Sequence, residues 1–158
     1  MLDFRRPAKS RNPIRILLVD DQLVFRAGLR ALLEKQPDLC VVGEAGRGDE
    51  AVACAKVTRP DVVLMDLAMP GEGGLDATRR IAALGLGAKV IVLTALTRER
   101  ELLEALEAGA NGFVEKMAPA EDVARGIRTV AAGGRFLGVD AAKLVVLQRY
   151  QKGVQATQ

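Results

Sequence analysis

Short apolar runs and segments with helical spacing alternate five times between residues 14 and 134. Three of the runs, at residues 16–19, 62–65 and 90–93, are almost continuous. Continuous runs of this length are typical of parallel strands that are buried on both faces of a sheet. The pattern predicts five strands, namely Ile14–Val19, Leu39–Glu44, Asp61–Met65, Lys89–Thr94 and Gly112–Glu115.

Apolar residues between these strands recur at the period of an α-helix. The first helical face consists of Val24, Phe25, Gly28, Leu29, Leu32 and Leu33, and Pro37 ends that segment. Further helices are predicted at Glu50–Val57, Leu75–Leu84, Glu99–Ala108 and Pro119–Ala132. Strand–helix alternation at this spacing predicts the α/β class, with a doubly wound five-stranded parallel sheet and helices on both of its faces.

The composition indicates one aliphatic domain with charged ends. Hydrophobic residues make up 49% of the 158 residues, and aromatic residues only 3%. Residues 1–13 and 135–158 each carry four basic residues and one acidic residue, so the central part is mildly acidic although the net charge is +3. A body of that sign does not indicate a nucleic-acid-binding domain. We expect a basic N-terminal tail at 1–13, a folded domain at 14–134 and a C-terminal helical extension at 135–158.

Neither a membrane span nor an export signal is evident in the sequence. No run approaches the roughly 20 apolar residues of a transmembrane helix, and the N-terminus lacks the apolar core of a signal peptide. We therefore expect no membrane partner and a cytoplasmic location. The chain also contains no histidine, which excludes histidine as an acid–base group or metal ligand.

Polar residues close the predicted strands. Asp20 and Asp21 follow the first strand, Asp66 closes the third, Thr94 closes the fourth, and Lys116 follows the fifth. Ligands of doubly wound sheets bind at the carboxyl ends of the strands. Taken alone, each residue has an ordinary interpretation as a turn, strand-end or surface residue. Together they predict a pocket with carboxylates, a hydroxyl and an ammonium.

Adjacent carboxylates need a cation, because two unit charges in contact near a protein surface repel by roughly 4 kcal/mol. An all-oxygen ligand set of this kind suits Mg²⁺ or Mn²⁺. An ionised Asp66 could attack phosphorus and form an acyl phosphate, while Thr94 and Lys116 stabilise charge on the phosphoryl oxygens. This chemistry needs no histidine in the chain.

These residues resemble the receiver domain of bacterial two-component response regulators. The matching motifs are Leu18-Val-Asp-Asp21, Met65-Asp-Leu-Ala-Met-Pro70 with Gly74, Leu93-Thr-Ala95, and Gly112-Phe-Val-Glu-Lys116. The resemblance spans residues 14–134 and implies a flavodoxin-like fold of strand order 2-1-3-4-5. The segments 26–33, 74–80 and 104–110 are similar to regulators of the NarL/FixJ (LuxR) type.

The resemblance also implies roles for individual residues. Asp66 would be the phosphoacceptor and would bind the divalent ion with Asp21 and the backbone carbonyl of Ala68. Asp20 would act on the ion mainly through water. Thr94 would be the switch hydroxyl, Lys116 would pair with a phosphoryl oxygen, and Phe113 would be the switch aromatic that rotates inward with Thr94.

Partners follow from the same resemblance. A sensor histidine kinase would donate the phosphoryl group, and a homodimer could form through the face of the fourth helix, fifth strand and fifth helix. Promoter DNA would be bound only through a C-terminal helix-turn-helix domain that this chain lacks, and residues 140–150 would begin the linker to it. The domain would be a phosphoacceptor rather than a turnover enzyme.

The sequence departs from the family pattern at a few positions beside the site. Gln22 stands where histidine is frequent, which we expect to matter little. Glu72 and Gly73 change the loop next to the site, Met117 follows the lysine where Asp or Pro is common, and Phe113 lacks the hydroxyl of the more frequent tyrosine. None of these departures removes a charge that the chemistry needs.

Other functions remain open at this point. A Mg²⁺-dependent phosphohydrolase with an Asp66 nucleophile would need a second acid at position 68, which is alanine, and a cap segment. A flavodoxin-like flavin module would need a Ser/Thr/Gly-rich phosphate loop where Asp20 and Asp21 stand. A receiver that signals without phosphorylation would not need the intact set of acids.

Overall fold

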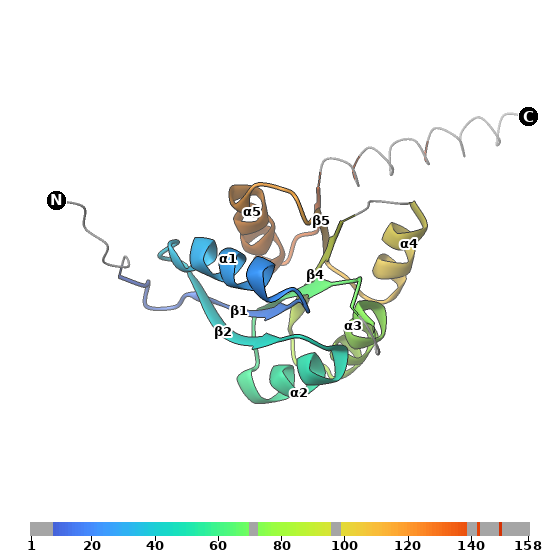
Figure 1. Cartoon of the computed structure of the whole chain (residues 1–158), viewed down its shortest axis with the longest axis horizontal. Coiled ribbons are helices and arrows are strands. Elements are labelled where there is room, and N and C mark those ends of the chain that lie inside the picture. The colour runs from blue at the N-terminus through green and yellow to red at the C-terminus, as the bar shows by residue number, and fades with distance from the viewer. Residues whose placement is uncertain (1–7, 70–72, 96–98, 139–141, 143–148, 150–158) are drawn as a thin grey trace, which may run out of the picture.

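The computed structural model describes residues 8–69, 73–95, 99–138, 142 and 149. These residues form a parallel sheet with helices on both faces (Figure 1). The sheet has the strand order β2-β1-β3-β4-β5-β6, and every neighbouring pair is parallel. The strands are β1 (Ile14–Val19), β2 (Leu39–Ala45), β3 (Val62–Asp66), β4 (Lys89–Thr94), β5 (Gly112–Glu115) and β6 (Phe136–Leu137). The α/β class and the order of the first five strands are confirmed.

Five helices connect the strands in the described residues. They are α1 (Leu23–Glu34), α2 (Gly48–Thr58), α3 (Gly74–Ala83), α4 (Glu99–Glu107) and α5 (Ala120–Ala131). Figure 1 shows α1 and α5 on one face of the sheet and α2 and α3 on the other. The five predicted helices are therefore present, with ends that differ from the prediction by a few residues, as is usual for helix termini.

Alternation along the strands divides the core into two layers. On β1, Leu17 and Val19 pack with residues of α2, α3 and α4, whereas Ile16 and Leu18 pack with residues of α1 and α5. Successive side chains of a strand point to opposite faces of the sheet. The continuous apolar runs are therefore explained by burial on both sides, as the sequence predicts.

The outer end of the sheet differs from the sequence expectation. The sheet has a sixth strand, β6, which pairs with β5 in parallel and lies in the segment expected to be a helical extension. A two-residue strand is too short to produce a recognisable pattern. Gly126 on α5 makes room for it, because a Cβ atom there would lie 2.9 Å from the Phe136 ring. The predicted helix at 140–150 lies almost entirely outside the described residues.

The predicted apolar face of α1 is only partly buried. Leu29 and Leu33 are in the core, but Val24 is 87% exposed and Leu32 is 46% exposed. Helical spacing predicts which residues share a face, but it does not show how far a neighbouring helix covers that face.

Among the described residues, no helix combines the length and apolar character that crossing a membrane requires.

Candidate functional site

Three aspartates meet at the carboxyl end of the sheet. Asp20 and Asp21 follow β1, and Asp66 is the last residue of the neighbouring strand β3. One carboxylate oxygen from each lies within 4.8 Å of the other two. Asp20 and Asp66 are buried, at 3% and 2% exposed, while Asp21 is exposed. The predicted convergence of these three side chains is therefore present in the structure.

Local backbone groups orient the two buried carboxylates. The backbone N–H of Gln22 donates to Asp20 Oδ1 at 2.8 Å, and that of Ala68 donates to Asp66 Oδ1 at 3.0 Å. Gly74, at the start of α3, allows the chain to pass close to Asp66, because a Cβ atom at Gly74 would lie 2.2 Å from the Asp66 carbonyl oxygen. The Oδ2 atoms of both aspartates face Lys116.

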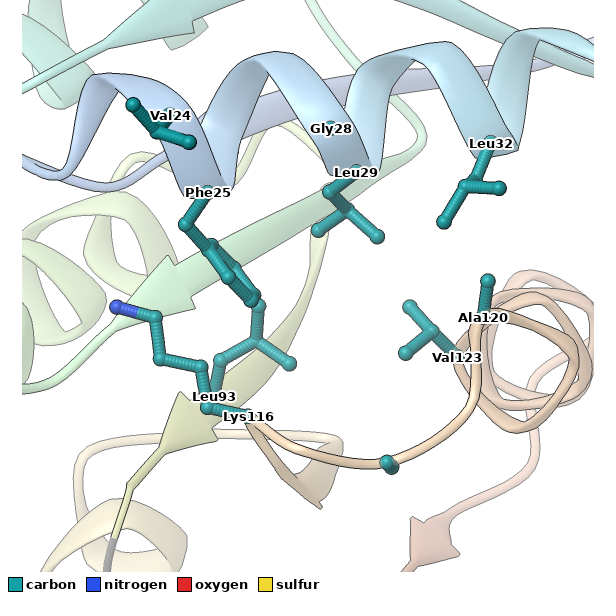
Figure 2. A pocket seen from close by; sticks show the side chains of 10 residues that line it. Val24, Phe25, Gly28, Leu29, Leu32, Leu93, Lys116, Ala120 and Val123 are labelled. Atoms are coloured by element: carbon teal, nitrogen blue, oxygen red, sulfur yellow. The ribbon is translucent and has the colours of Figure 1, made fainter.

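Lys116 is held from several sides just after β5. Its Nζ atom lies 2.8 Å from Asp20 Oδ2 and 3.4 Å from Asp66 Oδ2. It also donates to Gln22 Oε1 at 2.7 Å and lies 4.5 Å from the centroid of the Phe25 ring. Figure 2 shows the lysine passing along Phe25. Lys116 therefore lies beside both buried aspartates, at the end of the fifth strand where the sequence places it, and its role in a site stays a prediction.

The charge in this pocket is not balanced by the residues described. Burial, with the nearby Asp20 carboxylate, raises the pKa of Asp66 above its usual range, although the Ala68 N–H and Lys116 act in the opposite direction. Among the residues that the structure describes, none donates a hydrogen bond to Asp20 Oδ2, so the contact of this atom with Lys116 is an ion pair without a directed bond. Three carboxylates, one of which has a buried oxygen with unused acceptor capacity, fit a hard divalent cation.

The strand-end threonine makes a different contact from the acids. Asp66 pairs in register with Leu93, so Thr94 lies one residue beyond on β4. Its hydroxyl, in a residue only 5% exposed, donates to Glu101 Oε2 on α4 at 3.3 Å. The backbone N–H of Lys116 donates to the Thr94 carbonyl at 2.7 Å. Thr94 therefore lies at the carboxyl end of the sheet, as predicted, but its hydroxyl is hydrogen-bonded to Glu101 on α4.

The aromatic residue of the predicted switch is already inside the core. Phe113 is fully buried and lies in the same apolar cluster as Leu102 and Ala105 of α4. Ala95, which follows the threonine, is exposed. The inward rotation of Phe113 remains a prediction, but its side chain has this buried position while Thr94 is bonded to Glu101.

Sequence reasoning missed four residues around the site. Gln22 contacts Lys116, although we expected its identity to matter little, and Phe25 packs against the same ammonium. Arg26 binds the backbone at Asp20, and Glu101 binds Thr94. Gln22 and Phe25 could have been suspected from their place just after the acid pair. The contacts of Arg26 and Glu101 depend on how helices lie on the sheet, for which the sequence offered no signal.

Two other departures from the family pattern make no described contact with the acids. Met117 is 89% exposed, and Glu72 lies outside the described residues.

An apolar groove of about 240 Å³ opens between α1 and α5 beside Lys116, as Figure 2 shows. The exposed Val24 and Leu32 line it, which explains why part of the apolar face of α1 is not in the core.

Comparisons with known proteins agree with this geometry. The family model described as the response regulator receiver domain matches residues 16–128. Response regulator UvrY of Escherichia coli strain K12 is 41% identical over 138 residues, which cover 87% of this chain and 63% of UvrY. Transcriptional regulatory protein LiaR of Bacillus subtilis strain 168 is 42% identical over 143 residues, which cover 90% of this chain and 68% of LiaR.

A solved structure gives the same result. The crystal structure of a two-component response regulator of the LuxR family from Aurantimonas sp. SI85-9A1 matches with a TM-score of 0.84 and 37% identity, over 88% of this chain and 99% of that chain. The chain spans less than two thirds of the length of UvrY. From the family model, these relatives and the fold, we conclude that the chain belongs to the response regulator receiver domain family of two-component systems, in its NarL/FixJ (LuxR-type) subfamily.

Proposed function

We propose that this domain is a phosphoacceptor switch in which Asp66 receives a phosphoryl group from a histidine kinase in a step that depends on a divalent cation. The observation that carries the proposal is the environment of Asp66. Its carboxylate is buried, held at Oδ1 by the Ala68 N–H and directed at Oδ2 toward Lys116, with two further aspartates within reach of one ion. These are the parts that phosphoryl transfer to a carboxylate requires.

The reaction is a displacement at phosphorus. An ionised oxygen of Asp66 attacks and forms a carboxyl–phosphate bond, while the bond from phosphorus to the donor breaks and the leaving group keeps its electron pair. Lys116, 3.4 Å from Asp66 Oδ2, favours the ionised carboxylate and can then pair with a phosphoryl oxygen. A divalent cation held by Asp20, Asp21, Asp66 and the Ala68 carbonyl would supply positive charge to the phosphoryl oxygens.

The output would be a local rearrangement on the β4–α4 side. Thr94 must leave Glu101 to donate its hydroxyl to the phosphoryl group, and this exchange changes how α4 is held. Phe113, buried against α4, would couple the exchange to the surface of α4, β5 and α5. In a longer protein, homodimerisation through that surface would control promoter DNA binding by a further domain.

Treatment with Mg²⁺ and acetyl phosphate, followed by intact-mass measurement, tests the proposal. The unaltered chain should gain the mass of one phosphoryl group, Asp66→Asn should gain none, and Asp49→Asn, at an exposed position on α2, should behave like the unaltered chain. Absence of an adduct on the unaltered chain with Mg²⁺ and saturating donor would contradict the proposal and favour a receiver that signals without phosphorylation. Steady release of phosphate from phosphate monoesters would instead favour a phosphohydrolase.

The switch role is tested separately with Thr94→Ala. This variant should keep the phosphoryl adduct, because Asp66 and its acidic neighbours are unchanged. Backbone amide NMR shifts over α4 should change on phosphorylation of the unaltered chain and change much less in the variant. Equal shift changes in both proteins would exclude Thr94 as the switch hydroxyl while leaving the phosphoacceptor proposal intact.

A further inference from the structure

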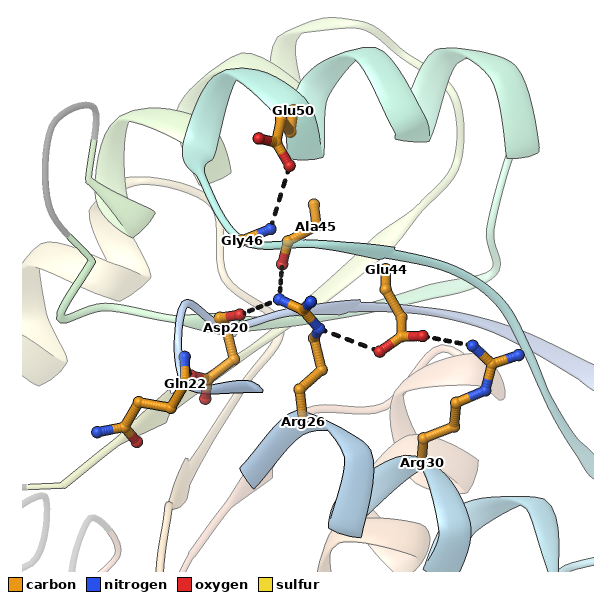
Figure 3. A network of polar contacts seen from close by, with 8 residues as sticks. All are labelled: Asp20, Gln22, Arg26, Arg30, Glu44, Ala45, Gly46 and Glu50. Carbon is orange, nitrogen blue, oxygen red and sulfur yellow. Dashed lines mark hydrogen bonds and ion pairs between the residues drawn. The ribbon is translucent and has the colours of Figure 1, made fainter. Parts of the chain in front are cut away.

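Arg26 of α1 is tied to the backbone at the point where the acidic residues begin. Its side chain is 15% exposed. The Nη1 atom donates to the Asp20 carbonyl oxygen at 2.5 Å and to the Ala45 carbonyl oxygen at 3.3 Å, and Nε donates to Glu44 Oε1 at 3.0 Å. Figure 3 shows the guanidinium between these groups. One side chain therefore joins α1 to the ends of β1 and β2.

The surrounding backbone is arranged to accept this guanidinium. The Asp20 N–H donates to the Ala45 carbonyl at 3.0 Å, so the ladder between β1 and β2 ends where Arg26 binds. Gly46 follows directly, and a Cβ atom there would lie 3.3 Å from Arg26 Nη1, closer than most side-chain contacts. A planar guanidinium with several fixed donors suits the bridging of two carbonyls and a carboxylate.

We propose that Arg26 is a positioning residue for the cation site: by fixing the Asp20 carbonyl, it holds the turn through which Asp20 and Asp21 reach Asp66. This inference rests on the proposed Mg²⁺-dependent function. Both ligand side chains leave the backbone at or next to the bonded carbonyl, so a change in that peptide redirects both carboxylates. Mutation of residues that orient metal ligands without touching the metal typically weakens metal affinity by about 10- to 100-fold.

The charge of Arg26 makes the direction of the effect informative. Through space, a guanidinium next to a cation site disfavours cation binding, so its removal by itself would strengthen Mg²⁺ affinity. The positioning role predicts the opposite direction. Glu44 binds both Arg26 and Arg30, and this pairing offsets the positive charge so that Arg26 can hold the turn.

Arg30 offers a matched control. It pairs with the same Glu44 carboxylate one helical turn later, but the contacts to the Asp20 and Ala45 carbonyls belong to Arg26. We would measure Mg²⁺ affinity by isothermal titration calorimetry, without any phosphoryl donor, for the unaltered chain, Arg26→Met, Arg26→Lys and Arg30→Met. Methionine keeps much of the apolar stem and removes the guanidinium. Thermal unfolding of each protein would report on folding.

Arg26→Met should weaken Mg²⁺ binding by about tenfold or more, Arg26→Lys should recover part of the loss, and Arg30→Met should change it by less than about twofold. Phosphorylation by acetyl phosphate should then need more Mg²⁺ in Arg26→Met, with a nearly normal rate at saturation. Unchanged or tighter Mg²⁺ binding in Arg26→Met, or an equal loss in Arg30→Met, would overturn the proposal.

Failure of the proposed function gives a different result. If the unaltered chain binds Mg²⁺ but takes no phosphoryl group, the phosphoacceptor proposal fails while the ranking of affinities still tests Arg26. If Arg26→Met does not fold, Arg26→Lys decides alone: a single ammonium cannot bridge the same groups, so an affinity equal to that of the unaltered chain would overturn the inference. Absence of Mg²⁺ binding by the unaltered chain would also overturn it.

Discussion

Two clusters of acids and cations lie at opposite ends of the sheet, and their charges are handled differently. The acidic edge, made of Asp20, Asp21, Asp66 and Lys116, lies at the carboxyl ends of the strands. The amino-terminal clamp, made of Lys9, Glu34, Asp38 and Arg128, lies where β1 and β2 begin. Each joins segments far apart in the sequence, and the acidic edge is the one that we propose to be reactive.

The amino-terminal clamp satisfies its polar groups. Lys9 Nζ donates to the carbonyls of Glu34, Gln36 and Leu39 at 2.6, 2.9 and 2.6 Å. Glu34 accepts the Val41 N–H at 3.0 Å. Both oxygens of Asp38 accept from Arg128, at 2.7 and 3.0 Å. Carbonyls at the end of α1 and the acids beside them therefore have partners, as stable buried or half-buried groups require.

The pKa values of the acids show the same contrast. Hydrogen bonding from Arg128 lowers the pKa of Asp38, and the pKa of Glu34 is lowered because the Val41 N–H and Lys9 outweigh its burial. At the acidic edge, burial raises the pKa of Asp66. The clamp therefore stabilises its ionised acids, while the acidic edge leaves Asp66 in need of more positive charge. Unbalanced buried charge is the feature that distinguishes the acidic edge, which we propose to be reactive, from the structural ion pairs of the clamp.

Replacing Lys116, the lysine of the acidic edge, should have the largest effect on the free energy of unfolding. Lys116→Met leaves two buried carboxylates without their ammonium, and loss of one partner of a buried pair costs about 3 kcal/mol. We expect a loss of this size in the free energy of unfolding at neutral pH with a chelator present. Mg²⁺ should recover much of it, because a cation replaces the missing charge. Urea unfolding with and without Mg²⁺ measures both effects.

Replacing Lys9 of the clamp should lower the free energy of unfolding by less, and Mg²⁺ should not recover this loss. Lys9→Met removes a charged donor from three carbonyls, which we expect to cost about 2 kcal/mol. Arg11→Met, at an exposed position in the same segment, should change the free energy of unfolding by less than about 0.5 kcal/mol. Recovery of Lys9→Met by Mg²⁺ to the same extent as Lys116→Met would remove the distinction between the two clusters.

These two clusters also mark how far the sequence could predict the structure. The acidic edge was predicted because each member closes a recognisable strand, and parallel strands bring their carboxyl ends together. The clamp was not predicted, since Lys9 lies in a segment interpreted as a basic tail and its partners are mostly backbone carbonyls. Backbone acceptors have no sequence signal. Such contacts depend on where the chain passes in three dimensions.

The same reason explains the gaps within the site. The sequence placed Asp66, Thr94 and Lys116 correctly at the carboxyl ends of the strands, because strand order determines where they lie. The bond from Thr94 to Glu101 depends on how α4 sits beside β4, and the two residues of β6 are too few for a pattern. Sequence therefore predicted the residues attached to strands well, and predicted poorly the contacts that helices make with them.

The smallest predicted effect is an opposite pH dependence of the two clusters. Asp66 has a folded-state pKa above its unfolded value near 3.8, so its contribution to stability is fully present below that value and is lost as the pH rises through the folded pKa. Asp38 has a folded-state pKa below 3.8. Its contribution is present above that value and is lost as the pH falls through the folded pKa.

Measurements of the free energy of unfolding against pH, without Mg²⁺, should separate these signs. The stability of Asp66→Asn relative to the unaltered chain should increase from about pH 4 toward neutrality. For Asp38→Asn, the relative loss should be largest near neutrality, shrink on acidification below about pH 4 and stay small, because the Asp38 side chain is 42% exposed and solvent screens its ion pair. Only the slopes are informative, since each substitution also changes hydrogen bonds by a pH-independent amount. If both variants gave the same slope, the acidic edge would be as well compensated as the clamp, and the physical reason for placing a cation at Asp20, Asp21 and Asp66 would be lost.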